Sequence, residues 1–418
     1  MVQGTPGKDL SWLDWSFLVA LSVVWLFIYA GFFFPGPSTL AYGVNPTRIL
    51  WAILLAGPLV YAGLVLLLLA LRRGRVEPGA AALLLTVLCV GLYICYGVAD
   101  ALYQRWFDRH KAEFHPYLQI TPPDDRRADS TTPGTIAVFC LGGSTTEFPD
   151  SSGRDWPSRV EEILRTSHGL SNVRVYNFGR QWYTSLHSLV NFEANLRKHR
   201  PQVILVMQAV NDLLQNADFS YFSHGPFRDD YGHFYGPVNR IVNRRSLWNY
   251  LQDIVRGLWY APPRKDVTTD HFVGLKAYER NMNTLAELAS CDGTTVVFVT
   301  EPFLVKREMS AEEQSVIGMT RVEAVNDTMG WTTETVFNGM MQYNEALRRL
   351  AAERKLPLID LEREIPKSLV YFRDEVHYRD TTFSVIAPFV AKNLAPIVER
   401  ISQRTCLRQA GTEKSRAH

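Results

Sequence analysis

The sequence has few cysteines, almost no net charge and no metal-binding spacing. Its 418 residues include only five cysteines, too few and too scattered for a disulfide framework. The 44 Lys and Arg residues nearly balance the 42 Asp and Glu residues, and a net charge of +2 gives no electrostatic reason to expect a nucleic-acid partner. No Cys-x-x-Cys pair or Cys/His spacing indicates a metal site, and we expect no cofactor.

Charge is also missing from three long apolar runs in the first hundred residues. Residues 15–34, 49–71 and 79–99 contain no charged side chain. Each run has about the 20 residues that a helix needs to cross the hydrocarbon core of a bilayer. A cleaved signal peptide is the alternative for the first run. It fits poorly, because no small-residue cleavage site follows and two more runs come after it. We predict three transmembrane helices.

The short loops between these runs predict the orientation. The loop after the second run reads RRGRVEP and has three arginines, whereas the loop after the first run has only Arg48. Basic loops stay in the cytoplasm, so the chain after residue 100 is predicted to lie outside it. Three basic residues within 105–111 oppose this bias. We expect a multi-pass protein of the inner or plasma membrane with a periplasmic C-terminal domain.

Composition divides the chain into four parts. We predict a membrane domain (1–112), a linker rich in Pro, Asp, Ser and Thr (113–134), a large domain (135–402) and a tail (403–418). Insertions are expected in the large domain at about 213–275, which is crowded with aromatic residues, and at about 303–337, which is mixed and polar and suits a lid. Within the first insertion, 245–260 has the apolar spacing of a helix that packs on the sheet or faces the bilayer.

Apolar strand patterns alternate with helical patterns in the large domain. Strands are expected at 135–143, 173–179, 202–210, 294–302 and 356–362, and helices at 156–167, 188–199, 279–290 and 338–355. This alternation predicts an α/β fold, a flavodoxin-like three-layer sandwich with a five-stranded parallel sheet. Sites in such sheets lie at the carboxyl ends of the strands.

Polar residues with complementary chemistry follow these strands. Ser144 comes after the first strand, Gly179 after the second and Asn211 after the third, while Asp374 and His377 stand late in the chain. Separately, the serine suits a helix cap and the acid–histidine pair suits a solvated loop. Together, a serine nucleophile needs a base such as His377, and that base needs an orienting acid such as Asp374. The Ser144 N–H, the Gly179 N–H and the Asn211 amide suit an oxyanion hole.

The order of these segments resembles the SGNH hydrolase superfamily, also called GDSL-like esterases and lipases. The matching segments are GGS (142–144), NFG (177–179), AVND (209–212) and DEVH (374–377), and the resemblance covers roughly 135–400. One departure is Ala209, where the family usually has glycine. Its methyl group is expected to narrow the cleft or shift the neighbouring asparagine.

The resemblance implies a role for each of these residues. Ser144 is the nucleophile, His377 the base and Asp374 its orienting acid, with oxyanion donors from Ser144, Gly179 and Asn211. With the apolar runs, this predicts a membrane-anchored bacterial serine esterase that cleaves acyl esters of a polysaccharide or lipid outside the cytoplasm. One alternative is an O-acyltransferase that works with a separate membrane acyltransferase on a cell-envelope polysaccharide. Another is a non-catalytic binding module with this fold.

Overall fold

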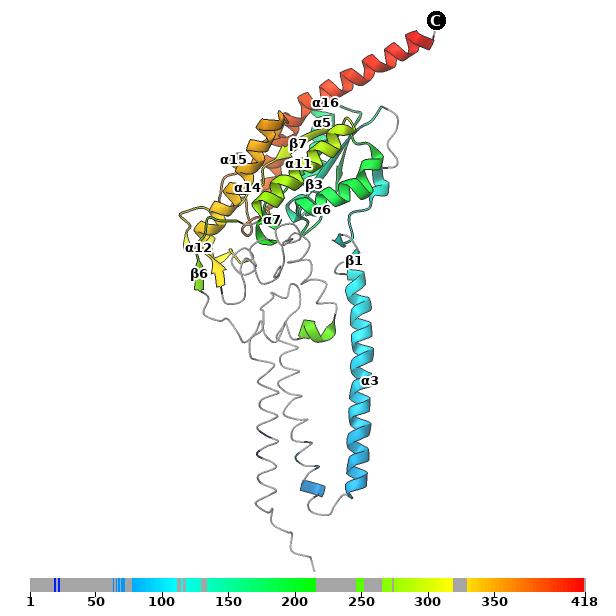
Figure 1. Ribbon diagram of the computed structural model, residues 1–418, viewed down its shortest axis with the longest axis vertical. Coiled ribbons are helices and arrows are strands. Elements are labelled where there is room, and N and C mark those ends of the chain that lie inside the picture. The colour runs from blue at the N-terminus through cyan, green and yellow to red at the C-terminus, as the bar shows by residue number, and fades with distance from the viewer. Residues whose placement is uncertain are drawn as a thin grey trace, which may run out of the picture. The chain divides into compact units, whose positions relative to one another are not determined.

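The computed structural model describes residues 77–110, 114–115, 118–128, 134–215, 246–251, 265–272, 274–318 and 329–416, with isolated positions before residue 72 (Figure 1). The chain forms two compact units. One comprises Met1–Ala112 with Ile241–Pro263, and the other Glu113–Arg240 with Arg264–His418. The predicted spans at 15–34 and 49–71 lie almost entirely outside the described residues.

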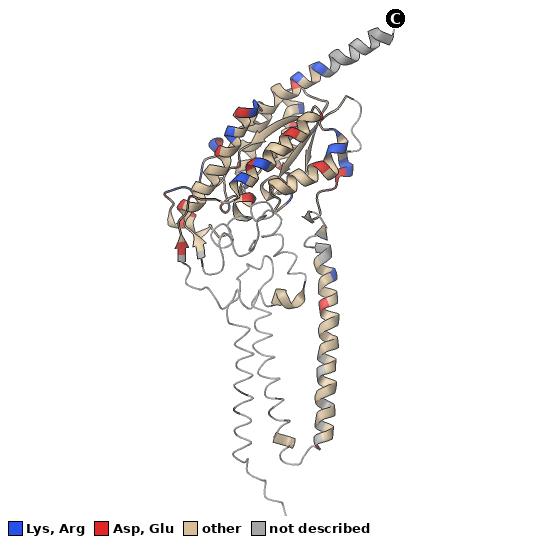
Figure 2. Cartoon of the chain, in the orientation of Figure 1, with Lys and Arg blue, Asp and Glu red and all other residues tan. Residues whose placement is uncertain are grey.

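The first unit contains one long described helix. Helix α3 (Pro78–His110) has 33 residues and covers the third apolar run (Figures 1 and 2). Many of its large apolar side chains are exposed: Leu83, Val87, Leu88, Val90, Tyr93, Ile94, Tyr96, Val98, Leu102 and Trp106. By length and composition, Leu85–Phe107 is one of two described helices that are able to cross a membrane. The other, Asp380–Arg404, has more than half of its most apolar window buried within the structure.

A short helical segment at 247–251 contacts α3. The Asp100 carboxylate accepts a hydrogen bond from the Leu247 N–H at 2.8 Å, and the rings of Tyr103 and Tyr250 stack with centroids 5.1 Å apart. This segment was expected to pack on the sheet or face the bilayer, and its described part contacts α3. The aromatic stretch at 219–236 and the rest of the predicted helix lie outside the described residues.

The second unit is built on a five-stranded parallel sheet, as predicted. Its strands are β3 (Ile136–Gly142), β4 (Val173–Asn177), β5 (Val203–Met207), β7 (Thr295–Val299) and β9 (Leu358–Ile359). Their spatial order is β4-β3-β5-β7-β9, and every pair is parallel. The central strands β3 and β5 are buried along their whole length, because helices cover both faces of the sheet.

Alternate side chains of the strands enter two separate cores. Phe139 and Ile204 face the core beneath helices α6 (Ser185–Asn191), α11 (Leu275–Cys291) and α14 (Thr333–Arg354). Val138 and Leu205 face the core beneath α5 (Trp156–Thr166) and α16 (Asp380–Arg416). This alternation follows from the two-residue period of a strand and gives the three layers visible in Figure 1. The buried part of helix α16 therefore belongs to the core of the second unit.

The segment expected as a linker contributes to the second unit. Strands β1 (Phe114–His115) and β2 (Gln119–Ile120) pair antiparallel, and a 3-10 turn, η1, follows at Asp125–Ala128. Leu118 and Ile120 are fully buried, and the Ile120 carbonyl accepts a hydrogen bond from the Tyr183 hydroxyl at 2.6 Å. These residues are thus part of the packed domain.

The second insertion begins with buried residues. Phe303, Leu304 and Val305 pack into the cores, and helix α12 (Ala311–Ser315) follows. Strand β8 (Met329–Trp331) pairs in parallel with β6 (Lys265–Val267), and α14 starts five residues earlier than predicted. The start of the insertion is therefore part of the core, while 319–328 lies outside the described residues.

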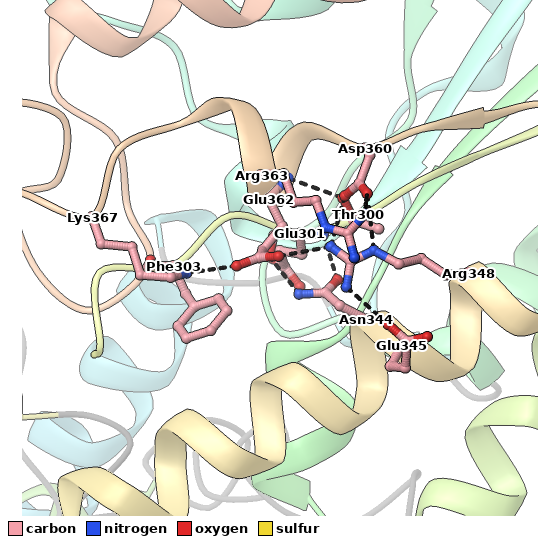
Figure 3. Close-up of polar contacts among 10 residues, drawn as sticks. All are labelled: Thr300, Glu301, Phe303, Asn344, Glu345, Arg348, Asp360, Glu362, Arg363 and Lys367. Carbon is pink, nitrogen blue, oxygen red and sulfur yellow. Dashed lines mark hydrogen bonds and ion pairs between the residues drawn. The ribbon is translucent and has the colours of Figure 1, made fainter. Parts of the chain in front are cut away.

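A buried ion-pair network holds the ends of β7 and β9 to α14 (Figure 3). The Arg348 guanidinium donates to Asp360 at 2.7 Å and to Glu362 at 2.7 Å. The Lys367 ammonium lies 2.8 Å from the other oxygen of Glu362 and donates to the Phe303 carbonyl at 3.1 Å. Burial by itself would raise the pKa of Glu362, but Lys367 and Arg348 outweigh it and hold the pKa below its ordinary value.

Replacing Arg348 by methionine should lower the free energy of unfolding by about 3 kcal/mol, because two carboxylates would lose their buried partner. Unfolding of the full-length protein by urea in detergent measures this. Arg363 is the matched control. Its side chain is 68% exposed and lies 3.4 Å from the same Asp360, so Arg363→Met should cost less than about 1 kcal/mol. Equal losses in the two variants would contradict the role of the buried network.

Candidate active site

The carboxyl ends of β3 and β5 each lead directly into a short helix. Helix α4 (Ser144–Glu147) starts one residue after Gly143, and α7 (Val210–Gln215) starts three residues after β5. A third segment, 372–378, is closed on itself by a bridge between Phe372 and Tyr378. The parallel sheet brings the first two segments to one edge, and the third meets them there.

Three of the predicted residues form a continuous hydrogen-bonded chain. The Ser144 Oγ lies 2.8 Å from Nε2 of His377. On the other side of the ring, His377 Nδ1 lies 2.8 Å from Oδ2 of Asp374. The serine and histidine are 233 positions apart in the sequence. The spacing of the three groups is that of a nucleophile, a base within hydrogen-bond reach and an acid that orients the base.

Asp374 is also held by the backbone of its own loop. Its Oδ1 accepts hydrogen bonds from the N–H groups of Val376 at 3.0 Å and His377 at 2.8 Å. Burial alone would raise the pKa of Asp374, but the bonds from the His377 side chain and from these N–H groups outweigh it and lower the pKa. The carboxylate is therefore ionised at neutral pH, as an orienting acid must be.

Phe148 and Arg373 complete the surroundings of the histidine. The Phe148 ring stacks on the His377 ring with centroids 5.4 Å apart and planes 28° apart. The Arg373 guanidinium lies 5.8 Å from the centroid of Phe148. Phe148 thus restricts the rotation of the imidazole and fixes its position relative to Ser144.

Asn211 lies beside the peptide that precedes Ser144. It is 2% exposed, and its Nδ2 donates to the Tyr183 carbonyl at 2.9 Å. A Cβ added at Gly143 would lie only 2.6 Å from this Nδ2, so the missing side chain makes room for the amide. An amide nitrogen carries two hydrogens, and Ser144, as the first residue of α4, has an N–H without an intrahelical acceptor. Both groups can supply hydrogens to an oxyanion near Ser144 Oγ.

Gly179 was expected as an oxyanion donor, and its N–H is engaged within its own turn. Its N–H donates to the Asn177 side-chain oxygen at 2.9 Å, so its single hydrogen is committed within the turn. The glycine is instead required by packing. A Cβ at this position would lie 2.7 Å from the Thr146 Cβ and 2.8 Å from the Glu147 nitrogen. The structure thus explains the glycine by its contact with α4.

The turn after Gly179 contains a residue that sequence reasoning missed. Trp182 has φ of 65°, in the left-handed region that is uncommon for a bulky residue. The turn is closed by a hydrogen bond from the Tyr183 N–H to the Arg180 carbonyl at 3.0 Å. This conformation places the carbonyl of Tyr183 where it holds Asn211. Nothing in the sequence marks this strained position, since it is not occupied by a glycine.

Glu301 is the second residue that was missed. It follows β7 by two positions, and its carboxyl group accepts a hydrogen bond from the Thr145 hydroxyl at 2.7 Å. Glu301 fell within the strand expected at 294–302, so it did not stand among the residues that follow a strand. Within the described ranges, no group of three or more His, Cys, Asp or Glu residues is arranged to hold a metal ion.

The chain is similar to one protein family and to several solved structures. The sequence profile of the GDSL-like Lipase/Acylhydrolase family matches residues 140–382. A lipase/acylhydrolase from Enterococcus faecalis is 12% identical, with a TM-score of 0.39 over 63% of this chain and 96% of its own. An acetylxylan esterase from Geobacillus stearothermophilus is 12% identical, with a TM-score of 0.38 over 62% of this chain and 94% of its own. No curated protein is significantly similar in sequence to this chain.

Replacing His377 by alanine should lower turnover of p-nitrophenyl acetate by about a thousandfold or more, because Ser144 would lose its base. The full-length protein in detergent, assayed beside a thermal melt, measures this. His199→Ala is the matched control, since His199 also pairs with an aspartate, with its Nε2 3.1 Å from Asp125. It should keep turnover within about twofold. Turnover near wild type in His377→Ala would remove that residue from the triad.

Proposed function

The chain belongs to the GDSL-like lipase/acylhydrolase family of ester hydrolases, and from this premise we propose that it cleaves acyl esters with Ser144 as nucleophile, His377 as base and Asp374 as the orienting acid. The observation that carries the proposal is the unbroken chain of contacts, with Ser144 Oγ 2.8 Å from His377 Nε2 and His377 Nδ1 2.8 Å from Asp374. This geometry suits proton removal from the hydroxyl as it attacks.

In the first half of the reaction, Ser144 Oγ attacks the ester carbonyl carbon while its proton passes to His377 Nε2. The carbonyl oxygen becomes an oxyanion, which accepts hydrogen bonds from the Ser144 N–H and the Asn211 amide. Asp374 stabilises the imidazolium through Nδ1–H without accepting the proton. When the tetrahedral intermediate collapses, His377 gives this proton to the leaving alcohol, and an acyl group remains on Ser144.

In the second half, water takes the place of the alcohol. His377 removes a proton from the water as its oxygen attacks the acyl-enzyme carbonyl, and returns it to Ser144 Oγ as the carboxylic acid leaves. The two oxyanion donors act again on the second intermediate. A contribution from Gly179 would require its N–H to leave Asn177, to which it donates at 2.9 Å.

The proposal includes anchoring in a membrane by the first 112 residues. Three charge-free runs support it, and so do the exposed apolar side chains of α3 along the third run. Exposed apolar side chains along such a length of helix suit a lipid environment. The arginines of the RRGRVEP loop support a cytoplasmic position for that loop and an extracytoplasmic position for the catalytic domain.

The substrate class follows from this setting. An extracytoplasmic esterase that is anchored beside the membrane meets acylated polysaccharides and lipids of the cell envelope. We propose acyl esters of these molecules as substrates, with water as the acceptor. Transfer of the acyl group to a sugar hydroxyl would use the same Ser144 intermediate with a different acceptor.

A fluorophosphonate probe should add once to the full-length protein, on Ser144, because only an activated serine attacks phosphorus quickly. Intact mass and the labelled peptide measure this. Ser144→Ala should abolish the adduct. Ser151→Ala should keep it, although Ser151 also contacts a carboxylate, that of Asp380. A folded protein that takes no label would argue for the binding-module alternative.

Reporter enzymes fused after residue 115 should be active only if the reporter functions outside the cytoplasm, because the basic loop before α3 stays inside. Paired fusions of alkaline phosphatase and β-galactosidase measure this. Fusions after residue 75, within the basic loop, are the control and should give the opposite pattern. A cytoplasmic signal at residue 115 would reverse the proposed orientation.

A further inference from the structure

We propose that Glu301 is a positioning residue of the active site, which sets the spacing between the nucleophile and the oxyanion donor by joining α4 to α7. The proposal rests on the function proposed for Ser144. Glu301 touches neither reacting atom, and it acts through the residues next to Ser144 and Asn211.

The two oxygens of the Glu301 carboxyl group bind two different catalytic segments. Oε1 accepts the hydroxyl of Thr145, the residue after Ser144, at 2.7 Å. Oε2 accepts the N–H of Val210, the residue before Asn211, at 2.9 Å. The planar carboxyl group therefore links the segment that follows β3 to the segment that follows β5.

The backbone of Glu301 is fixed in turn to a long helix. The Glu301 N–H donates to the Asn344 side-chain oxygen at 2.8 Å, and the Asn344 amide donates back to the Glu301 carbonyl at 3.0 Å (Figure 3). Asn344 belongs to α14 and is fully buried. This reciprocal pair leaves Glu301 little freedom to shift, so its carboxyl group is an anchored reference point for both catalytic segments.

The same loop also contacts the segment that carries the base. The Leu304 N–H donates to the Glu375 carbonyl at 2.8 Å, between Asp374 and His377. The Phe303 carbonyl accepts from Lys367 of the ion-pair network at 3.1 Å. Residues 301–304 thus bind the segments of the serine, the asparagine and the histidine, and Glu301 makes two of these three links.

Burying the Glu301 carboxyl group costs stability, so a contribution to stability alone does not explain the residue. Glu301 is 1% exposed, and desolvation raises its pKa despite the hydrogen bonds from Thr145 and Val210. A group with a raised folded-state pKa stabilises the fold at low pH, and this stabilisation is lost as the pH rises through that pKa. Glu301→Gln keeps the shape without the charge: its single oxygen can accept the Val210 N–H, and its amide nitrogen can donate to the Thr145 hydroxyl oxygen. This variant should therefore melt no lower than wild type at neutral pH.

A set of variants in the full-length protein tests the role, with p-nitrophenyl acetate as the substrate. Glu301→Leu removes both links and should lower kcat by about thirtyfold while KM stays within about twofold, since misplaced catalytic groups slow chemistry more than binding. Glu301→Gln should restore kcat to within about threefold of wild type. Thr145→Val removes one link and should lower kcat by about fivefold.

Thr294→Val is the matched control for Thr145→Val. Thr294 is equally buried, and its hydroxyl donates to the Pro201 carbonyl at 2.7 Å at the opposite end of β7. Its kcat should equal that of wild type, and thermal melts should show whether all variants are folded. If Glu301→Leu does not fold, the comparison of the two threonine variants decides the question by itself.

The outcomes separate this inference from the proposed function. If the wild-type protein shows neither esterase activity nor a Ser144 adduct, the proposed function is refuted. An active wild type beside a folded Glu301→Leu variant with unchanged kcat overturns the positioning role alone. A rise in KM without a fall in kcat overturns it too, and so does a Glu301→Gln variant as slow as Glu301→Leu. In the threonine comparison, equal kcat values for Thr145→Val and Thr294→Val overturn it.

Discussion

A charged or polar group that is taken out of water must find a partner, and this constraint shapes the carboxyl edge of the sheet. In the loop after β7, Glu301 takes donors from α4 and α7. Close by, Arg348 of α14 pairs with Asp360, which follows β9, and with Glu362 of α15 (Leu361–Glu364), and Lys367 pairs with Glu362 as well. Satisfying these groups forces segments that are far apart in sequence into one arrangement.

The serine, the histidine and the oxyanion donors are positioned by different means. Ser144 begins helix α4, which follows the buried strand β3. His377 lies in a loop that Asp374 stabilises through three hydrogen bonds. Asn211 depends on the carbonyl of Tyr183, which a left-handed residue puts in place. Of the two proposed oxyanion donors, Asn211 rests on a turn whose strain must be supported by its surroundings.

The sequence allowed the sheet and the catalytic chain to be predicted because both depend on local patterns. Apolar runs locate strands, and the ends of parallel strands meet at one edge, so Ser144 and Asn211 were singled out by position, and His377 by its chemistry and the resemblance of its segment. The oxyanion role of Gly179 stays a prediction, and its packing against Thr146 was not foreseen, because that contact is tertiary. Glu301 and the segment at 113–134 were missed for the same reason, since their partners lie on other elements.

The hydroxyl of Tyr183 joins the carbonyl of Ile120 to the turn that holds Asn211. The residues that follow α3 in the chain are therefore structural members of the enzyme, and they are not a tether that can be trimmed. A soluble fragment designed to begin at the first sheet strand would lose the buried side chains of Leu118 and Ile120 and expose the apolar surface beneath them. The first unit ends its N-terminal part at Ala112 but also includes Ile241–Pro263, so a single cut before residue 113 does not separate the two units.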